Sequence, residues 1–489
     1  MSTMGACLMN GLMTGYKWVT ERIAKIDLFD ETKSAERKTS PWYMLGAIYY
    51  LAWVLVMTSG LILVAFYIPT TSQAFDSINA IMANVPFGSI IRGFHKYGAD
   101  CMIIAATLRI YRMWFAGEYK NKGELTFILA LVLLLVAMYS GLTGYLLIWN
   151  QRAFWATKVF ATFPTYLDIT PGRWHWPWET VSGRDLTWFI PNAIGASTKI
   201  IGNLTHQGVT TSQILMGGAS IGQATMTRFF SLHFGISLIL LVVSELYFYQ
   251  NRLKRINLTR WSVLTVVLML LITSIIFPTE SGSRANPEVT PLPILSDWYF
   301  LALYQMLKYM DPYWATIWTV GIPVITVGLT FVDFGKETNI WKRPMFFCLA
   351  IMGFIQFVIF SLLIIANQAN IDRDPPYWYG SMVFFITIGQ FWHFALYRQL
   401  LPMMVWVGFN LVTSVFYLLH WHVISADWLM LWFQAQGNVA WNASNLYWNL
   451  LWVIYSVVQA AVAGALFLPK LPQYLTQPKL IVTELTDGR

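Results

Sequence analysis

The chain has 489 residues, of which 56% are hydrophobic and 11% charged, and its mean hydropathy is +0.52. This composition excludes the two independent soluble domains that the length alone suggests, and it predicts an integral membrane protein. The net charge of +8 does not indicate nucleic-acid binding, because Lys and Arg gather beside hydrophobic segments as membrane topology requires. The three cysteines have no paired spacing and no CxxCH occurs, so neither a disulfide framework nor a standard c-type haem site is indicated.

Ten apolar segments predict membrane-spanning helices, since a spanning helix needs about 20 apolar residues and no irregular backbone can face lipid. We therefore expect an all-α, polytopic transmembrane bundle of about 10 spans, with a four-helix core formed by the first four. The predicted spans are Tyr43–Pro69, Gly88–Trp114, Leu125–Trp149, Phe229–Tyr249, Ser262–Phe277, Tyr313–Asp333, Met345–Ala366, Trp378–Leu396, Met403–Trp421 and Leu446–Leu468.

The positive charges predict the orientation of these spans. With the N-terminus inside, the inner segments are richer in Lys and Arg for their length than the outer loops, which places both termini in the cytoplasm or its topological equivalent. Two long outer segments stand out, the Trp-rich residues 150–227 and the Pro-rich residues 278–312. Long loops on a rigid scaffold often carry function. The alternative for both segments is a periplasmic cap or a partner contact.

Two histidines, His95 and His233, lie at the outer starts of the second and fourth predicted spans. A histidine inside a membrane helix is costly and indicates a functional site. A single one, such as His393, is better explained as a hydrogen-bonded core residue. Two histidines at matching depth, on helices that can face each other in a bundle, favour a haem with two axial histidine ligands.

Four further residues complete the predicted haem site. Arg92 lies one helical turn before the first histidine and Arg228 five residues before the second, where cations can hold the two haem propionates. A compatible alternative is that both arginines snorkel to the membrane interface. Gly60 and Gly144 lie at about the level of the histidines, where a small residue lets a porphyrin edge approach the backbone. Glycines are also frequent in membrane helices in general.

Four stretches together resemble the cytochrome b/b6 family over roughly residues 40–400. Residues 87–95 resemble the start of its second helix. Residues 144–156 resemble its glycine–tyrosine turn and the short helix at its quinol-oxidation site. Residues 217–233 are similar to the start of the fourth helix, especially in the b6 branch, and residues 296–299 read Ser-Asp-Trp-Tyr where the family has Pro-Glu-Trp-Tyr. The order of these stretches is far more specific than any single one.

The resemblance implies that the two electrons of a quinol are split. One passes outward to a Rieske iron–sulfur protein and a c-type cytochrome, and the other crosses the membrane through two haems. Asp297 keeps a carboxylate where the family uses Glu as proton acceptor, and Tyr299 keeps the phenol, so we expect both at a catalytic quinol site. The alternative is that Asp297 caps a short helix over Trp298–Met310. The loss of proline at Ser296 weakens the resemblance there.

The chain departs from the family on the inner side of the core. In the family each ligand helix carries a second histidine about four turns further in, which is fourteen residues and roughly 21 Å. Here Arg109 stands fourteen residues after the first histidine, and Tyr247 and Phe248 stand at the matching positions of the fourth span. Neither position supplies an imidazole for a second haem.

Two more inner positions differ in the same direction. Of the inner glycine pair only Gly46 is present, with Ala130 at the partner position, and Met44 replaces the cysteine that attaches an extra haem in the b6 branch. We therefore expect one haem b near the outer side and no inner haem. Arg109 needs a partner inside the membrane, and Glu245 is the first candidate.

These observations predict a cytochrome b-type subunit of a respiratory electron-transfer complex that exchanges electrons with quinol and quinone. Its expected partners are a Rieske-type protein, a c-type cytochrome and the lipid of a prokaryotic cytoplasmic membrane, in a multi-subunit assembly for which dimerisation stays open. The alternative is a structural anchor derived from the same family, with little quinone turnover. A transporter is disfavoured, since neither an inverted repeat nor broken helices are evident.

The same observations predict four regions. The last region contains two helices beyond the family's core of eight, and His420 and His422 would face apart on a helix there, so we expect no haem in it. The regions are a cytoplasmic segment (1–42), the haem-binding four-helix bundle with its outer loop (43–260), the C-terminal helices with the outer quinol-site loop (261–400), and the extra helices with the C-terminal tail (401–489).

Overall fold

The predicted all-α fold is confirmed, and the described part of the chain consists of helices joined by turns and loops, with one isolated bridge between Asn150 and Arg284. Each of the ten segments predicted to span the membrane is helical. The computed structural model describes residues 13–22, 41–120, 122–168, 211–248, 258–291, 294–309, 312–366, 376–420 and 443–470.

The chain divides into two compact units, and the predicted site residues all belong to the first. The first unit comprises Met1–Ile169, Ala196–Tyr299 and Thr316–Lys336, and the second comprises Thr170–Gly195, Phe300–Ala315 and Glu337–Arg489.

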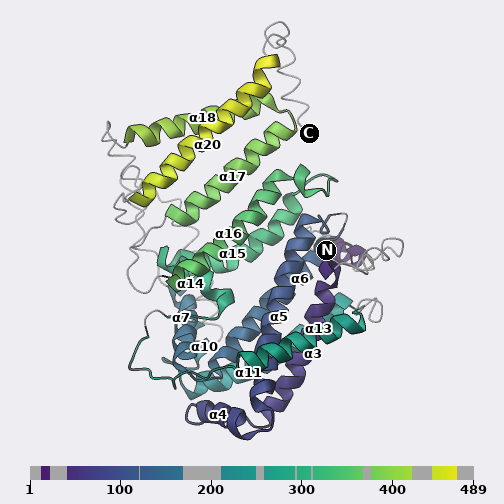
Figure 1. Cartoon of the computed structure of the whole chain (residues 1–489), viewed down its shortest axis with the longest axis vertical. Coiled ribbons are helices and arrows are strands. Elements are labelled where there is room, and N and C mark those ends of the chain that lie inside the picture. The colour runs from purple at the N-terminus through teal and green to yellow at the C-terminus, as the bar shows by residue number, and fades with distance from the viewer. Residues whose placement is uncertain are drawn as a thin grey trace, which may run out of the picture. The chain divides into compact units, whose positions relative to one another are not determined.

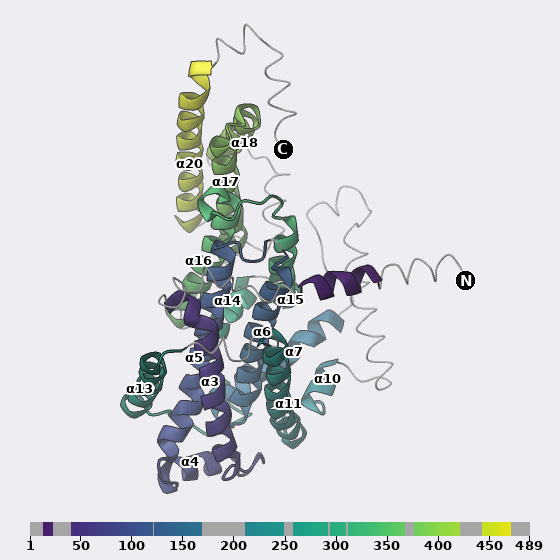
Figure 2. The same cartoon turned by 90° about the vertical axis from the view of Figure 1, so that its right-hand side faces the viewer.

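A four-helix core forms the centre of the first unit. Within it α3 packs on α5, α5 on α6, and α6 on α11 (Figures 1 and 2). This is the order of contacts expected from the first four spans. The core helices are α3 (Pro41–Val64), α5 (Gly88–Phe115), α6 (Glu124–Leu146) and α11 (Gln223–Phe248).

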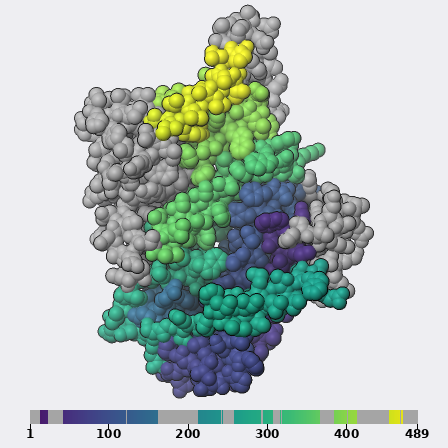
Figure 3. Space-filling model, in the orientation of Figure 1, coloured from purple at the N-terminus to yellow at the C-terminus, as the bar shows by residue number. Residues whose placement is uncertain are grey.

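Helix α13 (Arg260–Ile276) covers one face of this core, and Figure 3 shows it as a teal band there. Its contact with α5 is close, because a Cβ at Gly93 would lie 2.5 Å from Ser274 Oγ. The opposite face of α13 is apolar and exposed, with Trp261 76% exposed and Met269 62% exposed. Such a face suits lipid rather than water.

Among the residues that the structure describes, three helices are long and apolar enough to cross a membrane by length and composition alone: Trp42–Val64, Glu124–Leu146 and Pro344–Ile365. Helix α5 has 28 residues but also carries charged side chains, and charges inside a bilayer are costly unless they are paired. Three of these charges are paired: Lys96 pairs with Asp100 on the same helix, and Arg112 pairs with Glu118 just after the helix end.

Two helix boundaries differ from the prediction by five residues or more. Helix α3 ends at Val64 rather than at Pro69, and the chain then turns into α4 (Ala74–Asn84), which hydropathy did not reveal. Helix α11 begins at Gln223 rather than at Phe229, because the polar residues of its first turn continue the helix beyond the apolar segment. Polar helical ends of this kind are invisible to a search for apolar segments.

The outer helix α7 (Gln151–Asp168) holds the Pro-rich loop in place. Asn150, at the start of this helix, donates from Nδ2 to the carbonyl of Ser281 at 2.8 Å. Arg152 donates to the carbonyl of Ser296 at 3.3 Å. These bonds fix the loop directly before the predicted quinol-site residues.

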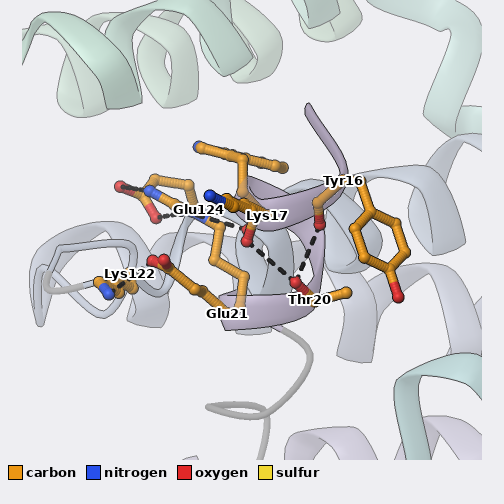
Figure 4. Close-up of polar contacts among 8 residues, drawn as sticks. Tyr16, Lys17, Thr20, Glu21, Lys122 and Glu124 are labelled. Atoms are coloured by element: carbon orange, nitrogen blue, oxygen red, sulfur yellow. Dashed lines mark hydrogen bonds and ion pairs between the residues drawn. The ribbon is translucent and has the colours of Figure 1, made fainter. Parts of the chain in front are cut away.

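At the other end of the core, a short helix over residues 13–22 docks on the start of α6 (Figure 4). Arg22 Nε lies 3.0 Å from the Glu124 carboxylate, and Lys122 Nζ lies 2.7 Å from that of Glu21. Because the first pair is partly buried, it orients the helix more strongly than the exposed second pair. This helix was not predicted from the sequence.

The second unit contains a chain of packed helices, in which α16 contacts α14 and α17, and α18 contacts α17 and α20. A buried amide pair joins the last two of these helices, since Asn410 Nδ2 donates to Gln459 Oε1 at 2.8 Å. The helices are α14 (Leu301–Tyr309), α16 (Pro344–Ala366), α17 (Pro376–Leu396), α18 (Leu400–His420) and α20 (Ala443–Phe467).

A buried ion pair ties the turn after α5 to the end of α15 (Pro312–Val332). Lys120 Nζ lies 2.9 Å from Asp333 Oδ1, and both side chains are about 5% exposed or less. We predict that Asp333→Asn lowers the free energy of unfolding by about 3–5 kcal/mol, because it leaves a buried ammonium without its counter-charge. The measurement is equilibrium unfolding of the full chain in detergent.

The matched control is Glu337→Gln, which breaks an exposed pair with Lys342. Here the side chains are 59% and 38% exposed, so the change should stay within about 1 kcal/mol. Equal effects of the two substitutions would contradict the assignment of Lys120–Asp333 as a structural tie.

Candidate haem site and neighbouring carboxylates

The structure brings the two predicted haem ligands together. His95 on α5 and His233 on α11 have ring centroids 6.0 Å apart, with 71° between the ring planes. Two metal–nitrogen bonds of about 2 Å each, together with the distance from each nitrogen to its ring centre, span roughly 6 Å. The separation therefore fits a metal ion held axially between the two imidazoles.

Each imidazole is oriented by a backbone carbonyl of the neighbouring helix. His95 Nδ1 lies 3.0 Å from the carbonyl oxygen of Val56 on α3, and His233 Nδ1 lies 3.0 Å from that of Ser140 on α6. A proton on Nδ1 donated to these oxygens leaves Nε2 with the lone pair that a metal needs. Both histidines thus have the Nδ1 hydrogen bond to a carbonyl oxygen that is expected of a metal ligand.

A hydroxyl and a glycine accompany each carbonyl. Ser59 and Thr143 place their hydroxyl oxygens 3.4 and 3.5 Å from the two Nδ1 atoms, and each is followed directly by a glycine. The carbonyl residue stands four positions before that glycine in both helices, which is about one helical turn. The same local arrangement therefore occurs on α3 and α6, one copy for each histidine.

The predicted glycines contact the histidines themselves. A Cβ at Gly60 would lie 2.9 Å from His95 Cε1, and a Cβ at Gly144 would lie 2.6 Å from His233 Cε1. A larger residue at either position would displace an imidazole. The side chains present therefore fit a haem between the two rings, since the glycines keep both imidazoles where a metal can reach them.

The two predicted propionate partners contact the outer loops. Arg92 donates to the carbonyl oxygens of Thr279 at 2.5 Å and Glu280 at 3.4 Å. Arg228 donates to the carbonyl oxygen of Ile214. These bonds place both guanidinium groups at the same end of the core, where α5 and α11 begin. Their role toward a haem propionate stays a prediction.

At the other end of the core, the Arg109 guanidinium stands beside Gly46, the glycine present of the predicted inner pair. Arg109 lies so close to Gly46 that a Cβ there would overlap its Nη1 atom. The space beside this glycine is therefore filled by a side chain of the same core, and the residues present do not fit a second haem. Three inner residues of the fourth span have side chains outside the described residues: Glu245, Tyr247 and Phe248.

A small cluster of polar side chains lies around the Asp-Trp-Tyr stretch. The Tyr299 hydroxyl donates to Asp297 Oδ2 at 3.4 Å, and Trp298 Nε1 donates to Asp100 Oδ1 at 2.9 Å. Lys96 Nζ lies 3.2 Å from Asp100 Oδ2. Two carboxylates, a phenol and an ammonium thus meet where the loop touches α5.

Burial raises the pKa of the Asp297 carboxyl above its usual range, and the negative charge of Asp100 raises it further. The positive charges of Lys96 and Arg152 oppose this shift. The pKa of Tyr299 also lies well above its usual value, because the phenol is buried and faces both carboxylates. A carboxyl with a raised pKa is suited to accepting and releasing a proton near neutral pH.

The cluster and the histidine pair touch the same face of α6. A Cβ at Gly141 would overlap the Tyr299 hydroxyl, just as one at Gly144 would crowd His233. Residues three apart on a helix are neighbours, about 5–6 Å between Cβ positions. The Tyr299 phenol therefore lies within a helical turn of the level of the imidazoles.

The predicted short helix after Asp297 is present, as the 3₁₀ turn η2 (Trp298–Phe300) followed by α14. The Asp297 side chain contacts the Tyr299 hydroxyl, which is a bond across the turn. Sequence reasoning missed Asp100 and the two hydroxyl residues beside the histidines. The two hydroxyl residues could have been predicted, because a Ser or Thr directly precedes each of the two predicted glycines, Gly60 and Gly144.

Comparison with known proteins identifies the architecture. Residues 31–191 match the cytochrome b/b6/petB family, and residues 284–391 match its C-terminal b6/petD part. The cytochrome b6 of Acaryochloris marina is 30% identical over 245 residues, which are 50% of this chain and 97% of that protein. The chain belongs to the cytochrome b/b6 family.

Two further similarities agree with this membership. The cytochrome b subunit of a cytochrome bc complex from Chlorobaculum thiosulfatiphilum is 28% identical over 311 residues, covering 58% of this chain and 63% of that one. A hyperthermophilic respiratory Complex III has the same fold, with a TM-score of 0.56 at 20% identity, covering 72% of this chain and 91% of that chain. The family implies haem b and a subunit of a membrane-embedded, multi-subunit electron-transfer complex.

The contact between Gly144 and His233 predicts a loss of haem when it is disturbed. Gly144→Val should lower haem b per chain several-fold, because its side chain would displace the imidazole. Gly235→Val on α11, the helix that carries His233, is the control and should keep wild-type haem, since a Cβ there meets nothing within 4 Å. A pyridine-haemochrome assay on the purified chain measures both, and full haem content in Gly144→Val would refute the site.

Proposed function

We propose that this cytochrome b-type subunit oxidises quinol at the outer side of the membrane and passes one electron to a single haem b held by His95 and His233. The observation that carries the proposal is the shared face of α6. There the Tyr299 phenol and the imidazole of His233 pack on glycines one turn apart. A proton-accepting carboxyl thus stands beside an electron-accepting centre, as quinol oxidation requires.

A haem bound between the histidines supplies one-electron transfer. The protein's own residues supply the proton chemistry. Asp297, with its raised pKa, takes a hydroxyl proton from quinol as the first electron leaves, and the Tyr299 phenol holds the acid through the bond to Oδ2. The second electron requires an outer one-electron acceptor, for which a Rieske-type iron–sulfur protein and then a c-type cytochrome have the right chemistry.

We propose one haem per chain. Arg109 beside Gly46 supports this, because a guanidinium stands where the family's second haem would lie. Arginine has no lone pair to offer a metal. Fourteen helical residues separate the two levels by roughly 21 Å. Without a cofactor there, fast electron transfer from the outer haem to an inner quinone site has no stepping stone in this chain.

The proposed setting is a prokaryotic cytoplasmic membrane with both termini inside. The charge distribution supports this orientation, since Lys17, Arg22, Lys120 and Lys122 all precede or follow spans on the proposed inner side. The first four spans form the haem-binding region in this scheme, and residues 261–400 supply the outer quinol loop. Residues 401–489 lie beyond the matched family segments, and their proposed role is contact with other subunits.

The alternative function is a membrane anchor that holds other redox subunits with little quinone turnover. The filled space beside Gly46 favours it, because a route across the membrane is interrupted there. The loss of the family's proline at Ser296 favours it as well. Quinol-dependent reduction of the haem separates the two functions.

We expect one haem b per chain in the purified complex and fast reduction of that haem by a short-chain quinol. Menadiol and decylubiquinol serve as probes in parallel. His95→Ala should abolish haem binding, and Asp297→Asn should keep the haem and slow its reduction by about 10²-fold or more. Reduction unaffected by Asp297→Asn would leave the anchor as the better function, and two haems per chain would overturn the one-haem proposal.

The pH dependence of haem reduction has a predicted sign. Asp297 accepts a proton only as the carboxylate, so the rate should fall as pH decreases through its pKa. Because that pKa is raised by burial, the midpoint should lie above the ordinary range of an aspartate. Stopped-flow measurements of haem reduction from about pH 4 to about pH 9 locate this midpoint, because the range begins near the ordinary pKa of an aspartate. A midpoint at or below the ordinary value would contradict the buried placement.

A further inference from the structure

The N-terminal helix (residues 13–22) has three different sides, and the first of them is packed against the core. Successive residues lie about 100° apart around a helix, so residues four apart share a side. Trp18 and Arg22 form the packed side, where the Arg22 guanidinium lies over the Trp18 ring, 4.2 Å from its centroid. Arg22 also pairs with Glu124, and Trp18 packs on Phe331 of α15 with ring centroids 6.2 Å apart.

The second side is apolar and exposed. Met13, Tyr16 and Val19 follow one another at three-residue spacing, and they are 53%, 66% and 37% exposed. Thr20 lies on the same side, because it is four residues after Tyr16. Its hydroxyl donates to the carbonyl oxygen of Tyr16 at 2.9 Å, so the proton of this one polar side chain is bonded within the helix itself.

The third side is polar. Lys17 and Glu21 are four residues apart and both are exposed, and Glu21 pairs with Lys122 in the turn before α6. Figure 4 shows the Glu21 side chain directed toward Lys122 and the Tyr16 ring directed away from it. The polar side therefore faces the turn, whereas the apolar side faces away from the turn.

The ion pairs fix the level of this helix along α6. Helix α6 is long and apolar enough to cross a membrane, and Glu124 is its first residue, so Glu124 stands where this span reaches the membrane surface. The N-terminal helix is held at Glu124 and Lys122, and Figure 2 shows it running across the direction of α6. A helix at this level, with one apolar and one polar side, has the pattern of an amphipathic helix that lies in the membrane interface.

We propose that the N-terminal helix is a phospholipid-binding surface, with Met13, Tyr16 and Val19 inserted at the boundary between headgroups and acyl chains. Burial of these three side chains in lipid removes apolar surface from water, and tyrosine favours this depth. Lys17 lies on the water side, where its ammonium attracts the phosphates of anionic lipids. Residues 13–22 would then lie in the membrane surface, unlike a segment that is wholly in the aqueous cytoplasm. The proposal does not depend on quinol oxidation.

The test is a measurement of depth with nitroxide spin labels on the full chain in its complex, reconstituted in nanodiscs of phosphatidylcholine and phosphatidylglycerol. The labels are placed singly in Tyr16→Cys, Val19→Cys and Lys17→Cys, with the three native cysteines replaced by alanine. Labels at positions 16 and 19 should be open to oxygen and sheltered from a water-soluble nickel chelate. Their ratio of oxygen to nickel accessibility should be several-fold higher than at position 17, which is the matched control on the polar side.

A photo-crosslinker gives a second measurement in a chain that keeps its cysteines. Benzoylphenylalanine in place of Tyr16 should attach phospholipid on illumination, and the same group in place of Lys17 should attach much less. Equal nickel accessibility at positions 16, 17 and 19 would place the helix in water and overturn the proposal. Shelter from both reagents at positions 16 and 19, together with a crosslink to protein, would overturn it in favour of a neighbouring subunit that covers this side.

Discussion

Close approach between helix backbones and imidazole rings at two glycines is the constraint on which the rest of this core depends. Gly60 and Gly144 leave no room for a side chain beside His95 and His233. Because each glycine follows a hydroxyl residue and a carbonyl one turn earlier, the same helix segment both accommodates an imidazole and orients its Nδ1 proton. In each of the helix pairs α3–α5 and α6–α11, one histidine and one glycine thus set how closely the two helices pack. The separation of the two imidazole rings follows from the packing of α5 on α6.

The helices and the histidine pair could be predicted from the sequence. Hydropathy locates the helices, and the spacing of His, Arg and Gly shows which residues of different helices lie at the same depth. All ten apolar segments are helical, and the two histidines meet. What could not be predicted depends on side-chain direction. Arg92 precedes His95 by one turn, yet its guanidinium bonds to the loop carbonyl of Thr279, because a long side chain at a helix start can point outward as easily as toward the next turn. Asp100 was missed for a related reason, since its partner Trp298 is 198 positions away in the chain.

At Gly46 the core uses a glycine to accommodate a side chain of one of its own helices. Gly46 keeps the backbone open, and the Arg109 side chain fills the opening. Nearby, the Tyr49 hydroxyl donates to the carbonyl of Leu133 on α6, so a polar side chain connects these helices. A glycine is needed beside this guanidinium, because the Cβ of an alanine there would force the arginine out of the core.

Helix α5 connects the two ends of the core, because it carries His95, Asp100 and Arg109 on one rigid element. Asp100 lies nine residues before Arg109, which is roughly 13.5 Å along the helix axis. Charges of opposite sign at these two levels have different surroundings: the carboxylate pairs with the half-exposed Lys96, whereas the guanidinium packs inside the core beside Gly46. Because a charge inside a bilayer is costly unless it is paired, the helix depends on Lys96 to hold Asp100 at its level.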